Sequence, residues 1–274
     1  MPEQVKRTSS ENAHPLPAGR GVLVIPHPGE EILGAVATLR HEGLERIVYV
    51  TDGAAPDGRD AARAGTPDVE RYRQMRRTET RAALQAGGID PDRAVFLGYG
   101  DQTAAFHLVS IARDLAAVLN SVDPAWVMTP AFAGRHPDED ATAMAAHGVV
   151  ASRVQTGRAA PELWEFVAYS FVDNTAEAAR SAAAAGFQAV PLGTAGEAFL
   201  EKLQAAHRSQ ARLRERERGD REFYRMAPHY DFADGPGSGR PAYERQPWGM
   251  SAAQWRELAR EAGDQLGLVC SMER

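Results

Sequence analysis

The sequence contains one cysteine, Cys270, in 274 residues, so it cannot form an intramolecular disulfide or a cysteine-based metal cage. It has no apolar run close to the roughly 20 residues that a membrane-spanning helix needs. Residues 1–20 lack the apolar core of a secretory signal. The net charge of −6 disfavours nucleic acid as the main partner, because a phosphate backbone binds basic surfaces. We therefore expect a cytoplasmic protein with no membrane span and no nucleic-acid partner.

The composition is that of a globular protein. Hydrophobic residues make up 43% of the chain and charged residues 25%, and 274 residues can bury one large core. Residues 1–19 are polar and contain proline, which predicts a flexible N-terminal tail. We find no internal repeat in the remainder, so we expect a single domain over residues 20–274.

Apolar runs alternate with helical patterns along the first part of the chain. Strands are predicted at 21–26, 46–51, 94–97 and 125–129, and helices at 30–42, 69–87, 106–120 and 138–154, with a long loop at 53–68. Alternation of this kind implies parallel strands joined by crossover helices. The fold class is therefore predicted to be α/β, a Rossmann-like, doubly wound, mostly parallel sheet flanked by helices.

The last third of the chain is less regular and predicts an irregular C-terminal extension. We expect a strand at 163–171, a helix at 196–218, an ordered loop at 223–249 and a terminal helix at 251–266. Ser251 is a suitable N-cap for the terminal helix.

Polar residues follow four of the predicted strands. His27, Asp52, Asp101 and His136 all come directly after a strand or the turn that ends it. In a doubly wound sheet, ligands bind beyond the carboxyl ends of the strands. The sequence therefore predicts one pocket that these residues share.

The first polar cluster is His27-Pro28-Gly29-Glu30-Glu31, at a strand-to-helix turn. An imidazole and a carboxylate three residues apart can face one point, and zinc accepts both ligand types at about 2.0–2.2 Å. The alternative is that Glu30 and Glu31 simply favour the positive end of the following helix. We favour that alternative for Glu31 and the metal-binding interpretation for His27.

The second polar cluster is His136-Pro137-Asp138-Glu139-Asp140, again at the start of a helix. His136 and Glu139 repeat the three-residue spacing of the first cluster. The alternative is a run of acids that stabilise a helix N-terminus. Because the cluster repeats the chemistry of the first one at a neighbouring strand end, the two together predict a metal-dependent hydrolase.

These motifs resemble those of the PIG-L/LmbE-like N-acetylglucosaminyl deacetylases. Pro26 to Glu31 corresponds to the family's [AP]-H-P-D-D-E, and His136 to Glu139 corresponds to its H-P-D-H. Further similarities are Thr51-Asp52-Gly53, the helix with Arg76, Glu79 and Ala83, the turn Leu97 to Asp101, the segment Lys202 to Gln210, and a tail with Tyr230 and Trp248 that is similar to a bacterial branch. The resemblance covers residues 21–266.

The resemblance implies roles for single residues. His27, Glu30 and Glu139 stand where the family has metal ligands, although Glu139 replaces a histidine. His136 stands where the family has the acid or oxyanion partner, with Asp138 as its orienting residue. Arg76, Asp101 and Asp52 are the predicted substrate-binding residues.

Gly29 stands where the family has its general base, and glycine has no side chain for that role. Loss of a general base lowers a rate by about 10²–10⁴. Glu31, Glu30 and Asp52 are candidate replacements. The oxygen-rich ligand set shifts the metal preference from Zn²⁺ towards Mn²⁺ or Mg²⁺.

The predicted function is the metal-dependent removal of an acetyl group from an N-acetylated, sugar-like small molecule. The resemblance implies Zn²⁺ as the cofactor of an active enzyme, with Mn²⁺ or Mg²⁺ as alternatives. The alternative function is a catalytically degenerate member that keeps the fold and pocket to bind a ligand or protein, or that performs metal-free chemistry.

Overall fold

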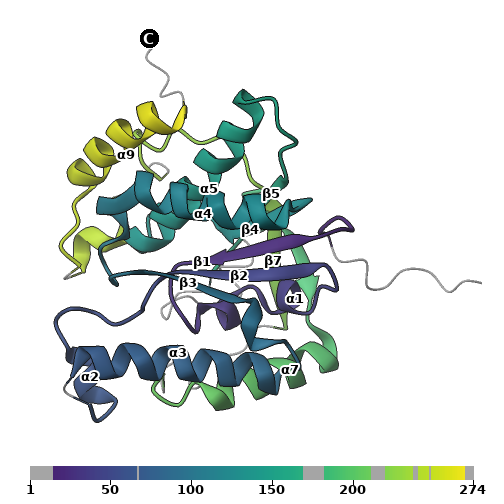
Figure 1. The fold of residues 1–274 in the computed structure, drawn as a ribbon. Helices are drawn as coiled ribbons and strands as arrows, with labels where there is room; N and C mark the ends of the chain where they lie inside the picture. The colour runs from purple at the N-terminus through teal and green to yellow at the C-terminus, as the bar shows by residue number, and fades with distance from the viewer. Residues whose placement is uncertain are drawn as a thin grey trace, which may run out of the picture.

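The computed structural model describes residues 15–66, 68–168, 182–210, 220–236, 240–246 and 248–268. It confirms the predicted α/β fold, with seven strands in the order β3-β2-β1-β4-β5-β7-β6 (Figure 1). The strands are β1 (Gly21–Ile25), β2 (Leu44–Thr51), β3 (Ala94–Tyr99), β4 (Trp126–Pro130), β5 (Glu162–Phe166), β6 (Gln188–Pro191) and β7 (Arg221–Met226).

The sheet is parallel from β3 to β5, whereas at the other edge β7 runs antiparallel to both of its neighbours, β5 and β6. The chain leaves β1 towards β2 on one side and later returns to place β4 on the other side. This makes the gap beyond the carboxyl ends of β1 and β4 the topological switch point, where sheets of this class bind ligands.

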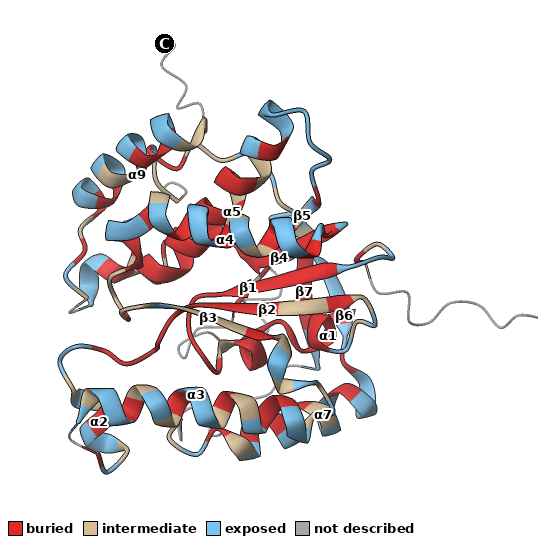
Figure 2. Cartoon of the chain, in the orientation of Figure 1, coloured by how far each residue is buried: buried red, intermediate tan, exposed pale blue. Residues whose placement is uncertain are grey.

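Helices cover both faces of the sheet (Figure 1). One layer contains α2 (Arg59–Arg63), α3 (Val69–Ala86) and α7 (Gly193–Ala206), and the other contains α4 (Leu108–Val122), α5 (Pro137–Gln155) and α9 (Ala252–Leu266). Every residue of β1 is buried, as a central strand of such a sheet requires (Figure 2). Leu23 and Ile25 pack in the core under α3 and α7, and Val22 and Val24 pack under α4 and α5.

The single helix predicted at 30–42 is wrong. The structure has a 3-10 helix, η1 (Glu30–Leu33), and a separate short helix, α1 (Val36–Leu39). Gly34 lies between them, so close to the backbone of Val167 that a Cβ would be 2.4 Å from its carbonyl oxygen. The buried carboxylate of Glu222 then accepts the N–H groups of Val36 and Ala37, which gives the second helix its own beginning.

The C-terminal prediction was partly wrong. The predicted loop at 223–249 contains β7 and the 3-10 helix η4 (Ala242–Arg245), and the edge strand β6 was not predicted. The predicted loop at 53–68 contains α2, and two short 3-10 helices, η2 (Pro91–Arg93) and η3 (Ala104–His107), precede β3 and α4. The N-cap at Ser251 is confirmed, because Ser251 and Gln254 form a capping box. Residues 1–14, 169–171 and 211–218, which complete three predicted segments, lie outside the described residues.

The segment Ala104–Val122 is long and apolar enough to pass for a membrane span by composition. It comprises η3 and α4, and α4 packs against α5 and α9 in the helical layer. Its apolar face is therefore explained by the core of the fold.

Candidate metal and active site

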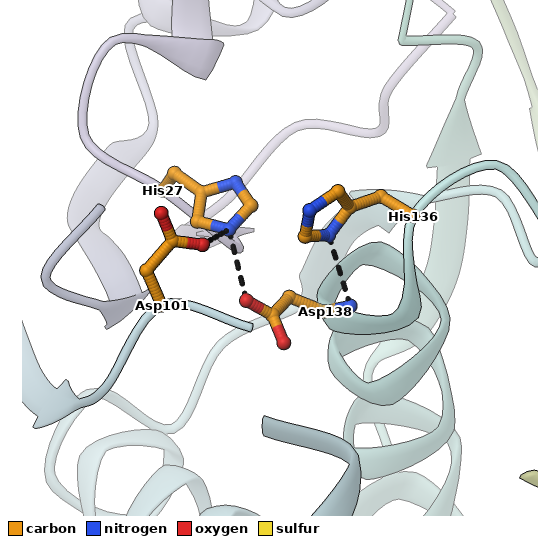
Figure 3. A group of neighbouring side chains, drawn as sticks. All are labelled: His27, Asp101, His136 and Asp138. Carbon is orange, nitrogen blue, oxygen red and sulfur yellow. Dashed lines mark hydrogen bonds and ion pairs between the residues drawn. The ribbon is translucent and has the colours of Figure 1, made fainter. Parts of the chain in front are cut away.

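Four side chains converge at the switch point (Figure 3). His27 follows β1, Asp101 follows β3, His136 is the N-cap of α5, and Asp138 lies in the first turn of that helix. One ligand atom from each lies within 4.8 Å of those of the others, so this group could hold a metal ion. Parallel strands bring these residues together because their carboxyl ends share one edge of the sheet.

His27 is the centre of the group. Its Nδ1 lies 2.6 Å from Glu30 Oε1, and its Nε2 lies 3.0 Å from both Asp101 Oδ1 and Asp138 Oδ2. Burial alone lowers the pKa of a histidine, but the surrounding carboxylates outweigh burial and raise the pKa of His27 well above 6.5. The same contacts outweigh burial at Glu30 and Asp101 and lower the pKa of both carboxyls.

Asp138 is fully buried, and both of its oxygens are occupied. Oδ1 accepts the N–H of Ala104 at 3.0 Å. Oδ2 accepts the N–H of Gln102 at 2.6 Å as well as facing His27. Asp138 therefore ties the turn after β3 to the start of α5 and fixes one side of the His27 ring.

The hydrogen bonds of His136 indicate which nitrogen carries its proton. Its Nδ1 accepts the backbone N–H of Asp138 at 3.1 Å. A neutral His136 in this geometry therefore has its proton on Nε2, which makes Nε2 a donor. The ring packs edge-on against His27, with centroids 4.8 Å apart, and lies 4.3 Å from the ring of Trp248.

Glu139 is buried and lies outside the group of four. Its Oε2 forms an ion pair with Arg135 Nη2 at 3.0 Å. Burial raises the pKa of Glu139, and the nearby charge of Glu30 adds to this rise, although Arg135 opposes it. Two carboxylates that repel each other beside His27 are a donor set that a cation would stabilise.

Carboxylates face both nitrogens of the His27 ring. On the Nδ1 side lies Glu30, whose charge also raises the pKa of Glu139; these are the two further ligands predicted from the sequence, and both lie outside the group of four. The Nε2 side offers Asp101, Asp138 and His136. One imidazole nitrogen together with two carboxylates is a set of ligands that fits a divalent metal on either side of the ring.

The predicted substrate-binding residues form hydrogen bonds that hold the loops around the site. Asp52 Oδ1 accepts the N–H groups of Ala54 and Asp101 at 2.9 and 3.2 Å, and Oδ2 accepts from Arg73 at 2.6 Å. Arg76 is buried and donates to the carbonyl oxygens of Gly53 and Pro28. Of the three predicted residues, Asp101 is the one whose side chain contacts His27.

Sequence reasoning assigned no role to Trp248 or His207, although both lie in segments that contribute to the resemblance. Trp248 packs on His136, and His207 forms a buried pair with Glu31, 3.0 Å between Nε2 and Oε1. Glu31 therefore does more than stabilise a helix terminus. Neither contact follows a helical or strand period, so no local signal could reveal it.

The chain is similar to known proteins in sequence over part of its length and in structure over most of it. Residues 22–150 match the PIG-L family, described as GlcNAc-PI de-N-acetylase. No curated protein matches the chain.

Three solved structures share the fold. A deacetylase triple mutant, Orf2*T, of the teicoplanin biosynthetic pathway is 20% identical with a TM-score of 0.57, covering 75% of this chain and 96% of that one. The A40926 pseudoaglycone deacetylase Dbv21 is 18% identical with a TM-score of 0.55, covering 76% and 96%. The conserved protein TT1542 from Thermus thermophilus is 21% identical with a TM-score of 0.52, covering 82% and 98%. At these identities the likeness shows the fold.

Proposed function

Because residues 22–150 form a PIG-L family domain, we propose that this chain is a deacetylase that removes an acetyl group from an N-acetylated, sugar-like small molecule in a metal-dependent hydrolysis. The observation that carries the proposal is the group of His27, Asp101, His136 and Asp138 at the switch point, in which His27 and Asp138 are buried. The deacetylase of the teicoplanin biosynthetic pathway and the A40926 pseudoaglycone deacetylase, which share the fold, support a small-molecule substrate. A cytoplasmic location is part of the same proposal.

We assign the metal to the Nδ1 side of His27, with Glu30 and Glu139 as the further ligands. Asp138 already accepts two backbone N–H groups, and the Nδ1 of His136 already accepts one, which makes both poorer ligands. With a metal on Nδ1, the Nε2–H of His27 donates to Asp101 and Asp138, the arrangement in which outer carboxylates orient a ligand histidine. The oxygen-rich set suits Mn²⁺ or Mg²⁺ as well as Zn²⁺.

The protein's own groups would act on the acetamide as follows. The chemistry that a divalent metal supplies when bound is Lewis acidity, which polarises a carbonyl oxygen and acidifies water. The Nε2–H of His136 is available to donate to the oxygen on which negative charge develops. Asp138 holds His27 and the start of α5 in register, so that this donor stays beside the metal ligands.

Gly29 leaves the proposed site without a dedicated general base, and Glu30, one of the three candidate replacements, is already assigned as a metal ligand. Glu31 faces His207 and Asp52 faces Arg73, so both carboxylates are committed to other groups. Of the three candidate replacements, Glu30 is the one that faces His27. A rate lower by about 10²–10⁴ than that of a site with a dedicated base is the expected consequence.

The second candidate function is a degenerate member that binds a ligand without hydrolysing it. Two observations favour it. Gly29 has φ +93° and offers no side chain. Arg135 already neutralises Glu139, so a metal must compete with a guanidinium for that carboxylate.

Metal content and acetate release separate the two functions. We expect one Mn²⁺ or Zn²⁺ per chain by elemental analysis after loading and gel filtration, and acetate release from N-acetylglucosamine derivatives. His27→Ala should lose both, whereas His107→Ala, which changes an exposed histidine away from the site, should lose neither. A wild-type protein that retains no metal and releases no acetate establishes the degenerate function instead.

A further inference from the structure

A buried histidine–glutamate pair lies behind the first motif. Glu31 and His207 are both fully buried, and His207 Nε2 lies 3.0 Å from Glu31 Oε1. Because a carboxylate can only accept, His207 Nε2 carries a proton in this contact. His207 Nδ1 has no hydrogen-bond partner among the residues that the structure describes, so the pair with Glu31 is the polar contact of this ring.

One further hydrogen bond connects the pair to the turn between the proposed metal ligands His27 and Glu30. The second oxygen of Glu31 accepts the backbone N–H of Gly29 at 2.7 Å. Gly29 has φ +93°, in the left-handed region, and stands between His27 and Glu30. The conformation of this turn determines how His27 and Glu30 face each other, so Glu31 sets the geometry of two proposed ligands without touching the metal position itself.

His207 is itself held in place independently of the first motif. Two residues further on, Ser209 donates its N–H and its Oγ–H to the two oxygens of Glu79 on α3, at 2.8 and 2.6 Å. Gln210 donates to the hydroxyl of Tyr72 on the same helix at 2.6 Å. The segment after α7 is therefore fixed on α3, and His207 projects from a fixed point towards Glu31.

We propose that His207 is a positioning residue that acts through Glu31 on the turn at Gly29 and so pre-organises His27 and Glu30 for the metal. The metal part of this inference depends on the proposed function, whereas the effect on the turn does not. Without the His207 donor, Glu31 Oε1 would lose its imidazole partner in the interior, and the carboxylate would shift towards another donor. Such a shift would loosen the hydrogen bond that Glu31 accepts from the Gly29 N–H.

The test compares two amides at position 207. The side-chain nitrogen of glutamine is as many bonds from Cα as His207 Nε2, and that of asparagine as many as Nδ1. His207→Gln therefore keeps a donor within reach of Glu31, and His207→Asn does not. Loss of a group that orients metal ligands weakens metal binding by about 10–100-fold, so we expect this for Mn²⁺ binding to H207N by calorimetry. H207Q should stay within about threefold of wild type on the same scale.

Lys202→Ala is the matched control, because it changes an exposed side chain of α7, the helix that leads to His207, and leaves the contacts of His207, Ser209 and Gln210 intact. Its Mn²⁺ affinity should remain that of wild type. If H207N does not fold, Glu31→Asp replaces it, because the shorter carboxylate cannot reach both His207 and Gly29. Wild-type Mn²⁺ affinity in whichever of these two variants folds overturns the inference.

Hydrogen exchange of the peptide at 26–33, measured without metal, separates this inference from the proposed function. H207N should exchange faster than wild type in this peptide, and H207Q and K202A should match wild type. If the wild-type protein binds no metal, the proposed function fails and the exchange data alone decide. Equal exchange in H207N and H207Q then refutes a positioning role for His207.

Discussion

Replacing Asp138 by asparagine tests the most constrained contact of the site. The Asp138 carboxylate is fully buried and accepts from Ala104 N–H on one oxygen and from Gln102 N–H and His27 on the other. Asparagine has one acceptor oxygen, and its NH₂ group can only donate. Whichever way the amide turns, its NH₂ group faces at least one backbone N–H, so two donors oppose each other in the interior.

The expected loss of stability follows from these contacts. A hydrogen bond to a charged group is worth about 1.5–3 kcal/mol, and a buried N–H left without a partner adds about 1–3 kcal/mol. We therefore expect Asp138→Asn to lower the free energy of unfolding by about 3–5 kcal/mol. At a slope of about 3 kcal/mol per M, the urea midpoint should fall by more than about 1 M.

Asp140→Asn is a matched control in the same helical turn. Asp140 is also fully buried, and its Oδ1 accepts the N–H groups of Ala133 and Gly134. Its Oδ2 has no hydrogen-bond partner in the described part of the chain, and burial raises the pKa of Asp140 well above its ordinary value. A neutral amide therefore fits this position, and we expect a loss within about 1 kcal/mol.

Urea unfolding followed by tryptophan fluorescence and by far-UV circular dichroism measures both variants. Coincident transitions would justify the two-state treatment. If D138N unfolds at the wild-type midpoint, or if D140N loses as much as D138N, the hydrogen-bond reasoning is refuted. In that case the two backbone N–H groups must find water or other partners when the carboxylate is removed.

Two further predictions concern the first motif. Gly29→Asp should destabilise the fold by about 1–2 kcal/mol because of its positive φ, yet release acetate faster than Gly29→Ala, which has the same strain and no carboxylate. Equal rates in the two variants would show that an acid here does not act as a base. Because the raised pKa of His27 means that metal must displace a proton, Mn²⁺ affinity should rise with pH through that pKa. The stability that protonated His27 gives the metal-free protein is present below pH 6.5 and is lost as the pH rises through the folded-state pKa. Calorimetry that shows no change with pH in the Mn²⁺ affinity or in the free energy of unfolding would contradict these effects.

The parallel half of the fold was predictable because its signal is local. Each strand from β1 to β4 is a short apolar run, and each is followed by a helical pattern with a recognisable end. The edge strand β6 and its neighbour β7 carried no such signal, because their residues alternate irregularly between exposed and buried and are mixed in character. The break between η1 and α1 was also hidden, since it depends on Glu222, which lies far along the chain.

The place of the site was predictable for the same reason, whereas its contacts were not. The sequence locates His27 and His136 at strand ends, and topology then brings them together. Which carboxylates face His27 depends on turn geometry, for example at Gln102, a non-glycine residue with φ +65° that places its N–H on Asp138. The role of Arg76 in substrate binding stays a prediction, and its hydrogen bonds to the backbone oxygens of Gly53 and Pro28 are contacts that no residue pattern reveals.

The residues that bear the family motifs and the residues that support them lie in different parts of the chain. The match to the family spans residues 22–150, and all four members of the group at the switch point lie within it. Two buried contacts to the first motif nevertheless come from beyond that span, His207 to Glu31 and Glu222 to the start of α1. A buried polar group left without its partner destabilises a fold strongly. The C-terminal strands and the segment after α7 are therefore part of the architecture that shapes the first motif, and substitutions there can change the site without altering either motif.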